Sequence, residues 1–552
     1  MSSRPSKSRR LAVWFTAVTA ALTLAGCSGR SETPNSNSNE PATFNEPPTA
    51  TNQVDSLTWA TRGEPGTLDS GSAFGGNSLV ILGNVCESLV TMAEDNTIEP
   101  LLASKVDHPD PTTYVFTLRD DVKFFDGSTM TADDVVFSLK RTVDPSTGSF
   151  FGSYGKNVAS VEATGTNQVT VKLTKADPIF YQMLASPMGQ VVEKKYVEAA
   201  GKAYGTSTSL PMCTGPYEVT SWESGQSISV EANADWWKGH DQLTKTAKFV
   251  FATDDATLSA GLKTGEIDGT FYPPASSLGA LAESDSLNVY TGPSTTFDAL
   301  VVTHPGGVIG NPKIREAIRL IIDYNGAAQA LFSGNAEPLK ALAPSGSWGP
   351  EDSEASKIYS KAYNELPGGE QDLEAAKEAV KASGETDPTV VLAVPSFLPD
   401  YAAFSHSFAA TAKEVGLNVE EKSLPQADFY ALYSDAKARA KYDLFSTQWL
   451  GFAADPTEIY SAVGLPDGSA NFGGYENPDV TKLLEEASAT DDAVERAKIV
   501  VEAQALIMAD LPWIPYVYEY QALTLNKRLA GTPIASPRWE YTAWLAQTGS
   551  AK

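Results

Sequence analysis

Residues 114–141 read YVFTLRDDVKFFDGSTMTADDVVFSLKR and carry the most informative local pattern in the chain. Large apolar residues alternate with small or polar ones over residues 114–119, which is typical of a half-buried strand. An Asp-Gly turn follows. Thr131 then occupies the position of a helix N-cap, with Asp134 three residues later and an apolar run beyond it. The stretch therefore predicts a strand, a turn and a capped helix in succession.

The same signals continue on both sides of this stretch. Strand-like alternation and amphipathic helical spacing recur along the chain, for example at residues 169–173, 227–231, 311–322, 442–448 and 493–510. Strand and helix patterns alternate almost throughout, which predicts a mixed α/β fold. The sequence contains no internal repeat of solenoid length.

Composition excludes several classes of protein. The 552 residues include 68 acidic and 41 basic side chains, giving a formal charge of −27. This acidic surplus argues against a nucleic-acid partner, because phosphate binding needs clustered Lys and Arg. Three cysteines and four histidines are too few for a Cys/His-rich metal protein. Beyond the N-terminus no run of 18 apolar residues occurs, so a multi-span membrane protein is not predicted.

The N-terminus is expected to be a signal peptide, residues 1–26. Four basic residues precede Leu11–Leu24, a run of fourteen uncharged residues that is short for a membrane span. The sequence Leu-Ala-Gly-Cys ending at Cys27 resembles the bacterial lipoprotein box, in which the Cys thiol after the cleavage point receives a lipid. We expect a lipidated (palmitate-bearing) Cys27, with an ordinary secretory signal as the alternative.

The residues after the lipid site are expected to form a tether. Residues 27–56 are rich in Ser, Asn, Thr and Pro and poor in apolar groups, so they predict a disordered link between lipid and folded body. With Cys27 lipidated, Cys86 and Cys213 remain in an oxidising compartment. We expect a disulfide between them, with two buried free thiols as the alternative.

Catalytic motifs are absent from the sequence. It has no Walker phosphate loop, no nucleophile elbow and no zinc-protease motif, so no catalytic residue, metal or cofactor is predicted. Aromatic residues in polar surroundings stand out instead. Trp449 ends a predicted strand and precedes a glycine-containing turn, and we expect it to line a ligand cleft.

Several segments occur in an order typical of one family. Behind the lipobox and residues 114–141 they are Thr214–Tyr217, Asn233–Trp237, Gly265–Asp268, Asn311–Ala317, Asp455–Pro456 and Ile514–Tyr516. Together they resemble bacterial solute-binding protein family 5, the dipeptide- and oligopeptide-binding proteins of ABC importers. The resemblance runs from about Leu57 to Tyr520.

The resemblance implies an α/β, two-lobed, periplasmic-binding-protein-like fold (class II, three-domain cluster C type) with a hinge between the lobes. The chain should cross between lobes near residues 300 and 509. The implied parts are the signal peptide 1–26, the lipidated Cys and tether 27–56, lobe 1 in three pieces (57–86, 208–300 and 509–552), an extra domain of lobe 1 at 87–207, and lobe 2 at 301–508.

The resemblance also implies a function without chemistry of its own. Such a protein binds peptides in the cleft between the lobes and delivers them to an ABC permease, whose ATPase subunits hydrolyse ATP. It would be an extracytoplasmic monomer without a cofactor, lipid-anchored to the outer face of the membrane. The alternatives are the same fold carrying an oligosaccharide, a metal chelate or another small solute, and, from other classes, a secreted hydrolase or a surface receptor.

The residues implied to contact ligand are Trp449, Leu450, Phe452, Asp455, Tyr516, Tyr518, Phe74 and Asn77. Peptide-binding members hold the free amine of the peptide with an Asp three positions after the pocket Trp, and this chain has Phe452 there. The anchor is then supplied from elsewhere, for example by Asp443 or Glu519, or the ligand has a blocked or absent amine, or the ligand is another solute.

Overall fold

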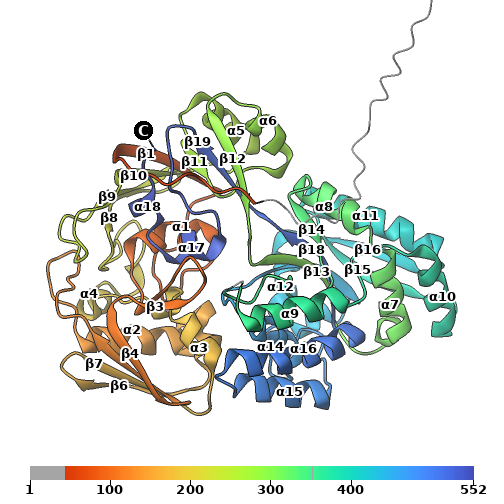
Figure 1. Ribbon diagram of the computed structural model, residues 1–552. Helices are drawn as coiled ribbons and strands as arrows, with labels where there is room; N and C mark the ends of the chain where they lie inside the picture. The colour runs from red at the N-terminus through yellow and green to blue at the C-terminus, as the bar shows by residue number, and fades with distance from the viewer. Residues whose placement is uncertain (1–43, 351, 552) are drawn as a thin grey trace, which may run out of the picture. The chain divides into compact units, whose positions relative to one another are not determined.

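The computed structural model describes residues 44–350 and 352–551, so the expected signal peptide and Cys27 lie outside the described residues. Within them the strands form sheets of seven, six, four and two strands, and helices connect them (Figure 1). The predicted α/β class is confirmed. None of the helices in this part of the chain is both long and apolar enough to span a membrane.

Lobe 1, as we define it, is built on the seven-stranded sheet. In spatial order its strands are β12 (Leu287–Gly292), β19 (Gln521–Asn526), β11 (Gly269–Thr270), β1 (Val54–Thr61), β10 (Thr244–Phe251), β9 (Ser227–Ala232) and β8 (Tyr217–Glu223). Its helices are α1 (Gly76–Val85), α5 (Asp255–Thr264), α6 (Leu278–Ala282), α17 (Ser536–Tyr541) and α18 (Trp544–Gln547). The core centres on Trp59, whose ring lies 4.8 Å from Phe271 and 4.5 Å from Trp544.

A smaller domain is inserted into lobe 1. Its strands are β2 (Val90–Met92), β3 (Ile98–Pro100), β4 (Ala103–Asp110), β5 (Thr113–Leu118), β6 (Val158–Gly165) and β7 (Gln168–Leu173), and its helices α2 (Ala132–Val143), α3 (Pro178–Met183), α4 (Lys194–Ala200) and the 3₁₀ helix η2 (Phe150–Gly155). The predicted strand and helix of residues 114–141 are β5 and α2. Thr131 and Asp134 form a reciprocal capping box at the start of α2, as their spacing predicts.

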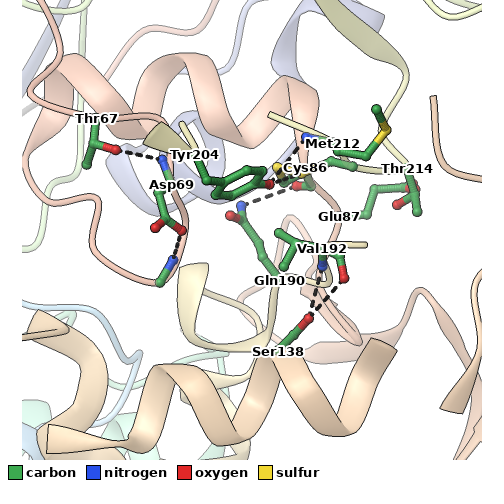
Figure 2. Close-up of a disulfide and its surroundings, with 12 residues drawn as sticks. Thr67, Asp69, Cys86, Glu87, Ser138, Gln190, Val192, Tyr204, Met212 and Thr214 are labelled. Carbon is green, nitrogen blue, oxygen red and sulfur yellow. Dashed lines mark hydrogen bonds between the residues drawn. A yellow bond between two sulfur atoms is a disulfide. The ribbon is translucent and has the colours of Figure 1, made fainter. Parts of the chain in front are cut away.

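Two segments of the chain connect this small domain to the rest of lobe 1, and a disulfide links these two segments to each other. Cys86 directly follows α1, Cys213 lies just before β8, and the two sulfur atoms are bonded (Figure 2). The pairing expected from the sequence is thus present in the structure. Tyr204 lies beside it, and its hydroxyl accepts a hydrogen bond from the backbone N–H of Met212 at 3.3 Å.

Lobe 2 is built on the six-stranded sheet. In spatial order its strands are β14 (Ala336–Pro338), β18 (Trp513–Glu519), β13 (Thr296–Val302), β17 (Leu444–Leu450), β15 (Thr389–Pro395) and β16 (Asn418–Leu424). Its helices are α7 (Pro312–Ile321), α8 (Tyr324–Phe332), α9 (Glu354–Glu365), α10 (Leu373–Ser383), α11 (Pro399–Glu414), α12 (Gln426–Ser434), α13 (Ala436–Arg439), α14 (Thr457–Gly464), α15 (Pro478–Ser488) and α16 (Ala493–Asp510). Helices α8 and α11 pack on one face of this sheet, where Phe404 stacks on Tyr516 with ring centroids 4.8 Å apart.

The chain passes twice between the two large sheets, a few residues before the first expected crossing and well after the second. It passes from β12 to β13 at residues 293–295 and from β18 to β19 at Tyr520, whereas the expected crossings were near 300 and 509. The expected positions lie inside β13 and α16. Residues 513–519 therefore belong to the sheet of lobe 2, because β18 pairs with β13 before the chain continues into lobe 1.

The expected tether ends earlier than residue 56. Asn45 exchanges hydrogen bonds with Thr291, and Asn52 forms a bridge with Ser550. Strand β1 begins at Val54. Polar groups of residues 44–56 thus form hydrogen bonds with strands and with the C-terminal segment. These hydrogen bonds order the stretch with little apolar burial.

Candidate functional site

One edge of the six-stranded sheet gathers several polar side chains. Strands β15 and β17 run parallel, and β13 runs antiparallel to both β17 and β18, so β15, β17 and β18 all end at the same edge. Both changes of sheet, at residues 293–295 and Tyr520, occur at this edge (Figure 1). In α/β proteins ligands bind outside the carboxyl ends of strands. This edge is therefore the candidate site.

Asp298 is the most buried charged group at this edge. Its side chain has no exposed surface, and its Oδ1 accepts a hydrogen bond from the hydroxyl of Tyr401 at the start of α11. Its Oδ2 is buried without a hydrogen-bond partner among the described residues. An unpaired buried carboxylate oxygen is costly, so this oxygen is a candidate ligand contact.

Glu519 lies on the neighbouring strand β18 and is bonded to Gln448 of β17. Gln448 stands directly opposite Asp298 in the β13–β17 register, and its Nε2 donates to Glu519 Oε2 at 3.1 Å. Gln448 is exposed and Glu519 is partly exposed. Exposure thus decreases from Gln448 through Glu519 to the fully buried Asp298. We call Asp298 and Glu519 the anionic pair.

The environment of the anionic pair favours protonation. Burial raises the pKa of Asp298 to about 7, although the hydrogen bond from Tyr401 acts in the opposite direction. Burial and the charge of Asp298 raise the pKa of Glu519 to about 8. Near neutral pH the two carboxyl groups therefore carry less than two full negative charges.

One tyrosine of lobe 1, Tyr272, is coupled to Glu519. Burial, followed by the charges of Glu540 and Glu519, raises the pKa of Tyr272. The Tyr272 hydroxyl lies so close to Gly76 that a Cβ atom there would be only 1.6 Å away. Glycine at residue 76 is what admits this ring.

The two predicted contacts from lobe 1 have different surroundings. Phe74 precedes α1, is 53% exposed, and its ring lies 4.2 Å from Phe150 of the small domain. This exposure is compatible with the expected ligand contact, which remains a prediction. Asn77 is only partly buried, and its Oδ1 accepts a hydrogen bond from the backbone N–H of Arg62 at 3.0 Å. This contact fixes the end of β1, so the side-chain oxygen of Asn77 already has a hydrogen-bond partner within the protein.

Trp449 lies at the same edge on the other face of the sheet from Gln448. It stands opposite Phe297 in the register and packs edge-on against Trp513 at 6.1 Å. The side chain is only partly buried, yet its Nε1 is buried without a hydrogen-bond partner among the described residues. This free donor is compatible with the expected ligand contact, which remains a prediction.

Phe452 occupies a contact between the lobes. It is 1% exposed, and its ring lies 5.3 Å from Phe150, 5.4 Å from Phe151 and 6.3 Å from Tyr541. We call these four residues and Tyr154 the interlobe aromatic cluster. Leu450 also packs against the small-domain core. The expectation that Phe452 offers a surface to ligand is not supported, because its ring is enclosed by lobe 1.

Glu458 holds the loop that carries Phe452. Its carboxylate accepts hydrogen bonds from the backbone N–H groups of Phe452 and Ala453 and from the hydroxyl of Tyr154, at 3.0, 2.8 and 2.6 Å. Burial raises the pKa of Glu458 to about 7 despite these donors. Since Tyr154 belongs to the small domain, Glu458 also joins the two lobes.

Three residues expected at the ligand have other roles. Asp455 is 2% exposed, forms an ion pair with Arg496 at 2.8 Å and caps the turn before α14. Tyr516 is fully buried in the core of lobe 2. The Tyr518 hydroxyl donates to the carbonyl oxygen of Ser294 at 2.7 Å and thus ties the two crossing segments together.

Sequence reasoning missed Asp298, Tyr401 and Gln448. Asp298 interrupts the apolar strand FDALVV, and that charge was the available signal. Of the two alternative anchors, Glu519 lies in the site, whereas Asp443 accepts a backbone hydrogen bond from Val391 at 2.7 Å and lies 3.1 Å from His304. In the described part of the chain no group of three or more His, Cys, Asp and Glu side chains is arranged to hold a metal ion.

Comparison with known proteins identifies relatives along most of the chain. The family described as bacterial extracellular solute-binding proteins, family 5 Middle, matches residues 97–471. The glutathione-binding protein GsiB of Salmonella typhi is 26% identical over 485 residues, which cover 84% of this chain and 89% of that protein.

Two solved structures share the fold. DppA from Helicobacter pylori in complex with the peptide STSA has a TM-score of 0.75 and 21% identity, over 90% of this chain and 98% of that one. NikA from Staphylococcus aureus in complex with Ni(L-His)2 has a TM-score of 0.71 and 20% identity, over 90% of this chain and all of that one. The likeness extends to both lobes, because nine-tenths of the chain is covered.

Proposed function

This chain belongs to the family 5 bacterial extracellular solute-binding proteins, and from that premise we propose that it binds peptides at the junction of its lobes and delivers them to an ABC permease. Proteins of this family are solute-binding components of ABC importers. The observation that carries the peptide proposal is the anionic pair at the carboxyl edge of the lobe 2 sheet. A free peptide amine is a cation that such a site suits.

The relatives support a peptide-like solute. The relative from Salmonella typhi is named for glutathione, itself a small peptide, and the Helicobacter pylori protein is in complex with a peptide. The second candidate is a nickel–histidine complex, since the Staphylococcus aureus protein holds one. An oligosaccharide remains the third candidate, and it would leave the buried oxygen of Asp298 without a charged partner.

One experiment distinguishes a binding protein from an enzyme. We propose to measure the melting temperature with trialanine, reduced glutathione, maltotriose and nickel with L-histidine, and to follow each compound by chromatography. A single-site ligand at a hundred times its Kd adds about 2.7 kcal/mol to the stability. Stabilisation by peptides without their consumption is expected. Consumption would identify a hydrolase, and stabilisation by maltotriose or nickel–histidine alone would replace the peptide proposal.

Trp449 tests the position of the site. The change Trp449→Ala should weaken peptide binding by about 2 kcal/mol or more and leave the melting temperature of the ligand-free protein nearly unchanged. Trp513→Ala is the matched control, because Trp513 is 2% exposed and its Nε1 donates to the carbonyl oxygen of Ala470. If Trp449→Ala behaves like Trp513→Ala, Trp449 is a core residue.

We further propose that the protein is a lipoprotein anchored to the outer face of the cell membrane through Cys27. The support is the Leu-Ala-Gly-Cys sequence after an uncharged run, which resembles a lipoprotein box. The variant Cys27→Ala should appear in the medium with unchanged melting temperature. Retention of this variant in the membrane fraction would contradict lipid anchoring.

A further inference from the structure

We propose that Asp298 and Glu519 together form the anchor for a cationic nitrogen group of the solute, which is the free α-ammonium group where the solute is a peptide. The inference rests on the proposed function and adds to it the residues that recognise one end of the solute. Its starting point is the geometry of the pair: a fully buried carboxylate, a partly exposed one, and an exposed amide beside them.

Asp298 differs from every other buried aspartate in the described residues. Of the five, three form an ion pair with arginine and one caps a helix: Asp69 with Arg141, Asp268 with Arg528, Asp455 with Arg496, and Asp134 at α2. Only Asp298 combines complete burial with an oxygen that has no partner. Because buried charges are normally paired, a partner from outside the chain is indicated.

The surroundings of the pair supply no positive charge. Among the ion pairs of the described residues, none includes Asp298 or Glu519. Apart from the pair itself, the described residues whose pKa is affected by the charge of Asp298 or Glu519 are tyrosines: Tyr401 of α11, Tyr433 of α12, Tyr516 and Tyr518 of β18, and Tyr272 of lobe 1. All five are neutral near pH 7, since burial raises their pKa above the ordinary tyrosine value.

The arrangement also fits the shape of an ammonium group. Such a group has three N–H donors in a compact head. Asp298 Oδ2 is one unused acceptor, and Glu519 is the second carboxylate, whose side chain is bonded only by Gln448 among the described residues. Asp298 and Gln448 lie directly opposite each other, and Glu519 follows two residues after Val517, the residue opposite Asp298 on β18. All three side chains thus point to one face of the sheet.

The experiment compares free and blocked amines. Calorimetric affinities are measured for trialanine, N-acetyl-trialanine and an N-acetylated tripeptide containing lysine, using wild type, Asp298→Asn and Glu519→Gln. Glu337→Gln is the control: Glu337 is a partly buried carboxyl group of the same sheet that accepts a hydrogen bond from Tyr520 at 2.7 Å.

For wild type and the control we expect acetylation of trialanine to weaken binding about tenfold or more, the size of a charge-assisted contact. In Asp298→Asn and Glu519→Gln this preference should disappear. Tight binding of the acetylated lysine peptide by wild type, lost in both variants, would identify a side-chain ammonium group as the anchored cation. Equal binding of all three peptides by wild type would refute the anchor and leave the peptide function intact.

The ligand-free melting temperature distinguishes a binding role from a structural one. Near pH 8 both amide variants should melt at or above the wild-type temperature, because they remove an unpaired charge. If both melt lower and weaken all peptides by the same factor, the pair is structural and the inference is wrong. If no peptide binds wild type, the peptide function is wrong. In that case, lower ligand-free melting temperatures of both variants would still show that the pair is structural and that the anchor is wrong.

Discussion

Replacing Phe452 with alanine should separate the two lobes of the ligand-free protein without unfolding either of them. Phe452 lies in the loop after β17 of lobe 2, is 1% exposed, and is enclosed by aromatic rings of lobe 1. Its ring is therefore buried only while the lobes are in contact. Removing it weakens the contact between lobes and leaves the sheets of both lobes unchanged.

The expected magnitude follows from the burial of this ring. Complete burial of a phenylalanine side chain is worth about 3 kcal/mol, and truncation to alanine in well-packed cores costs about 3–5 kcal/mol. The hydrogen bond from Tyr154 to Glu458 remains in the variant. We therefore expect Phe452→Ala to weaken the contact between the lobes by about 3 kcal/mol. This change shifts the ratio of separated to contacting lobes about a hundredfold.

Small-angle scattering of the ligand-free protein measures the separation directly. The radius of gyration should increase in Phe452→Ala, while the melting temperature changes little. Phe404→Ala is the matched control, because Phe404 is 7% exposed and stacks on Tyr516 within lobe 2. This control should lower the melting temperature and leave the radius unchanged. If Phe452→Ala does the same, the cluster is part of one continuous core and the reasoning is wrong.

Three further changes test other contacts. Replacing Cys86 and Cys213 together by serine should lower the free energy of unfolding by about 2–4 kcal/mol in chemical denaturation, and no loss would contradict a structural disulfide. Asp455→Asn should cost about 3–5 kcal/mol, because it leaves the buried Arg496 uncompensated; a loss of ligand affinity without a loss of stability would return Asp455 to the binding site. The pKa of Glu458 is raised to about 7, so its contribution to stability is complete at low pH and is lost as pH rises from about 5 to about 8. Glu458→Gln should flatten this part of the melting profile, and an unchanged slope would show that other groups cause it.

Local signals predicted local structure well. The capping box of Thr131 and Asp134 and the alternation before it depend on neighbours in the sequence, and β5 and α2 formed as expected. The disulfide followed from counting cysteines in an oxidising compartment. The expected crossing near 509 was displaced because a strand after α16 first pairs within lobe 2, and long-range pairing is not encoded by local pattern.

The candidate site was predicted less well for a related reason. Strand β18 is buried on both faces, so its sequence does not reveal which side chains face the core. Tyr516 and Tyr518 are equally aromatic, yet one packs in the core and the other bonds the crossing segment. Asp298 and Glu519 lie far apart in the sequence, and only the order of strands in the sheet brings them together.

Two contributions of similar size act on different equilibria of the ligand-free protein. The interlobe aromatic cluster favours contact between the lobes by about 3 kcal/mol. The pKa of Asp298 is about 7 against an ordinary value of 3.8, and at about 1.4 kcal/mol per unit its burial without a cation disfavours the ionised form by about 4 kcal/mol. A bound ammonium group would remove the second contribution and leave the first in place. On the proposed anchor, a ligand with a free amine thus gains affinity through its charge, whereas a neutral solute of the same size gains only its own contacts.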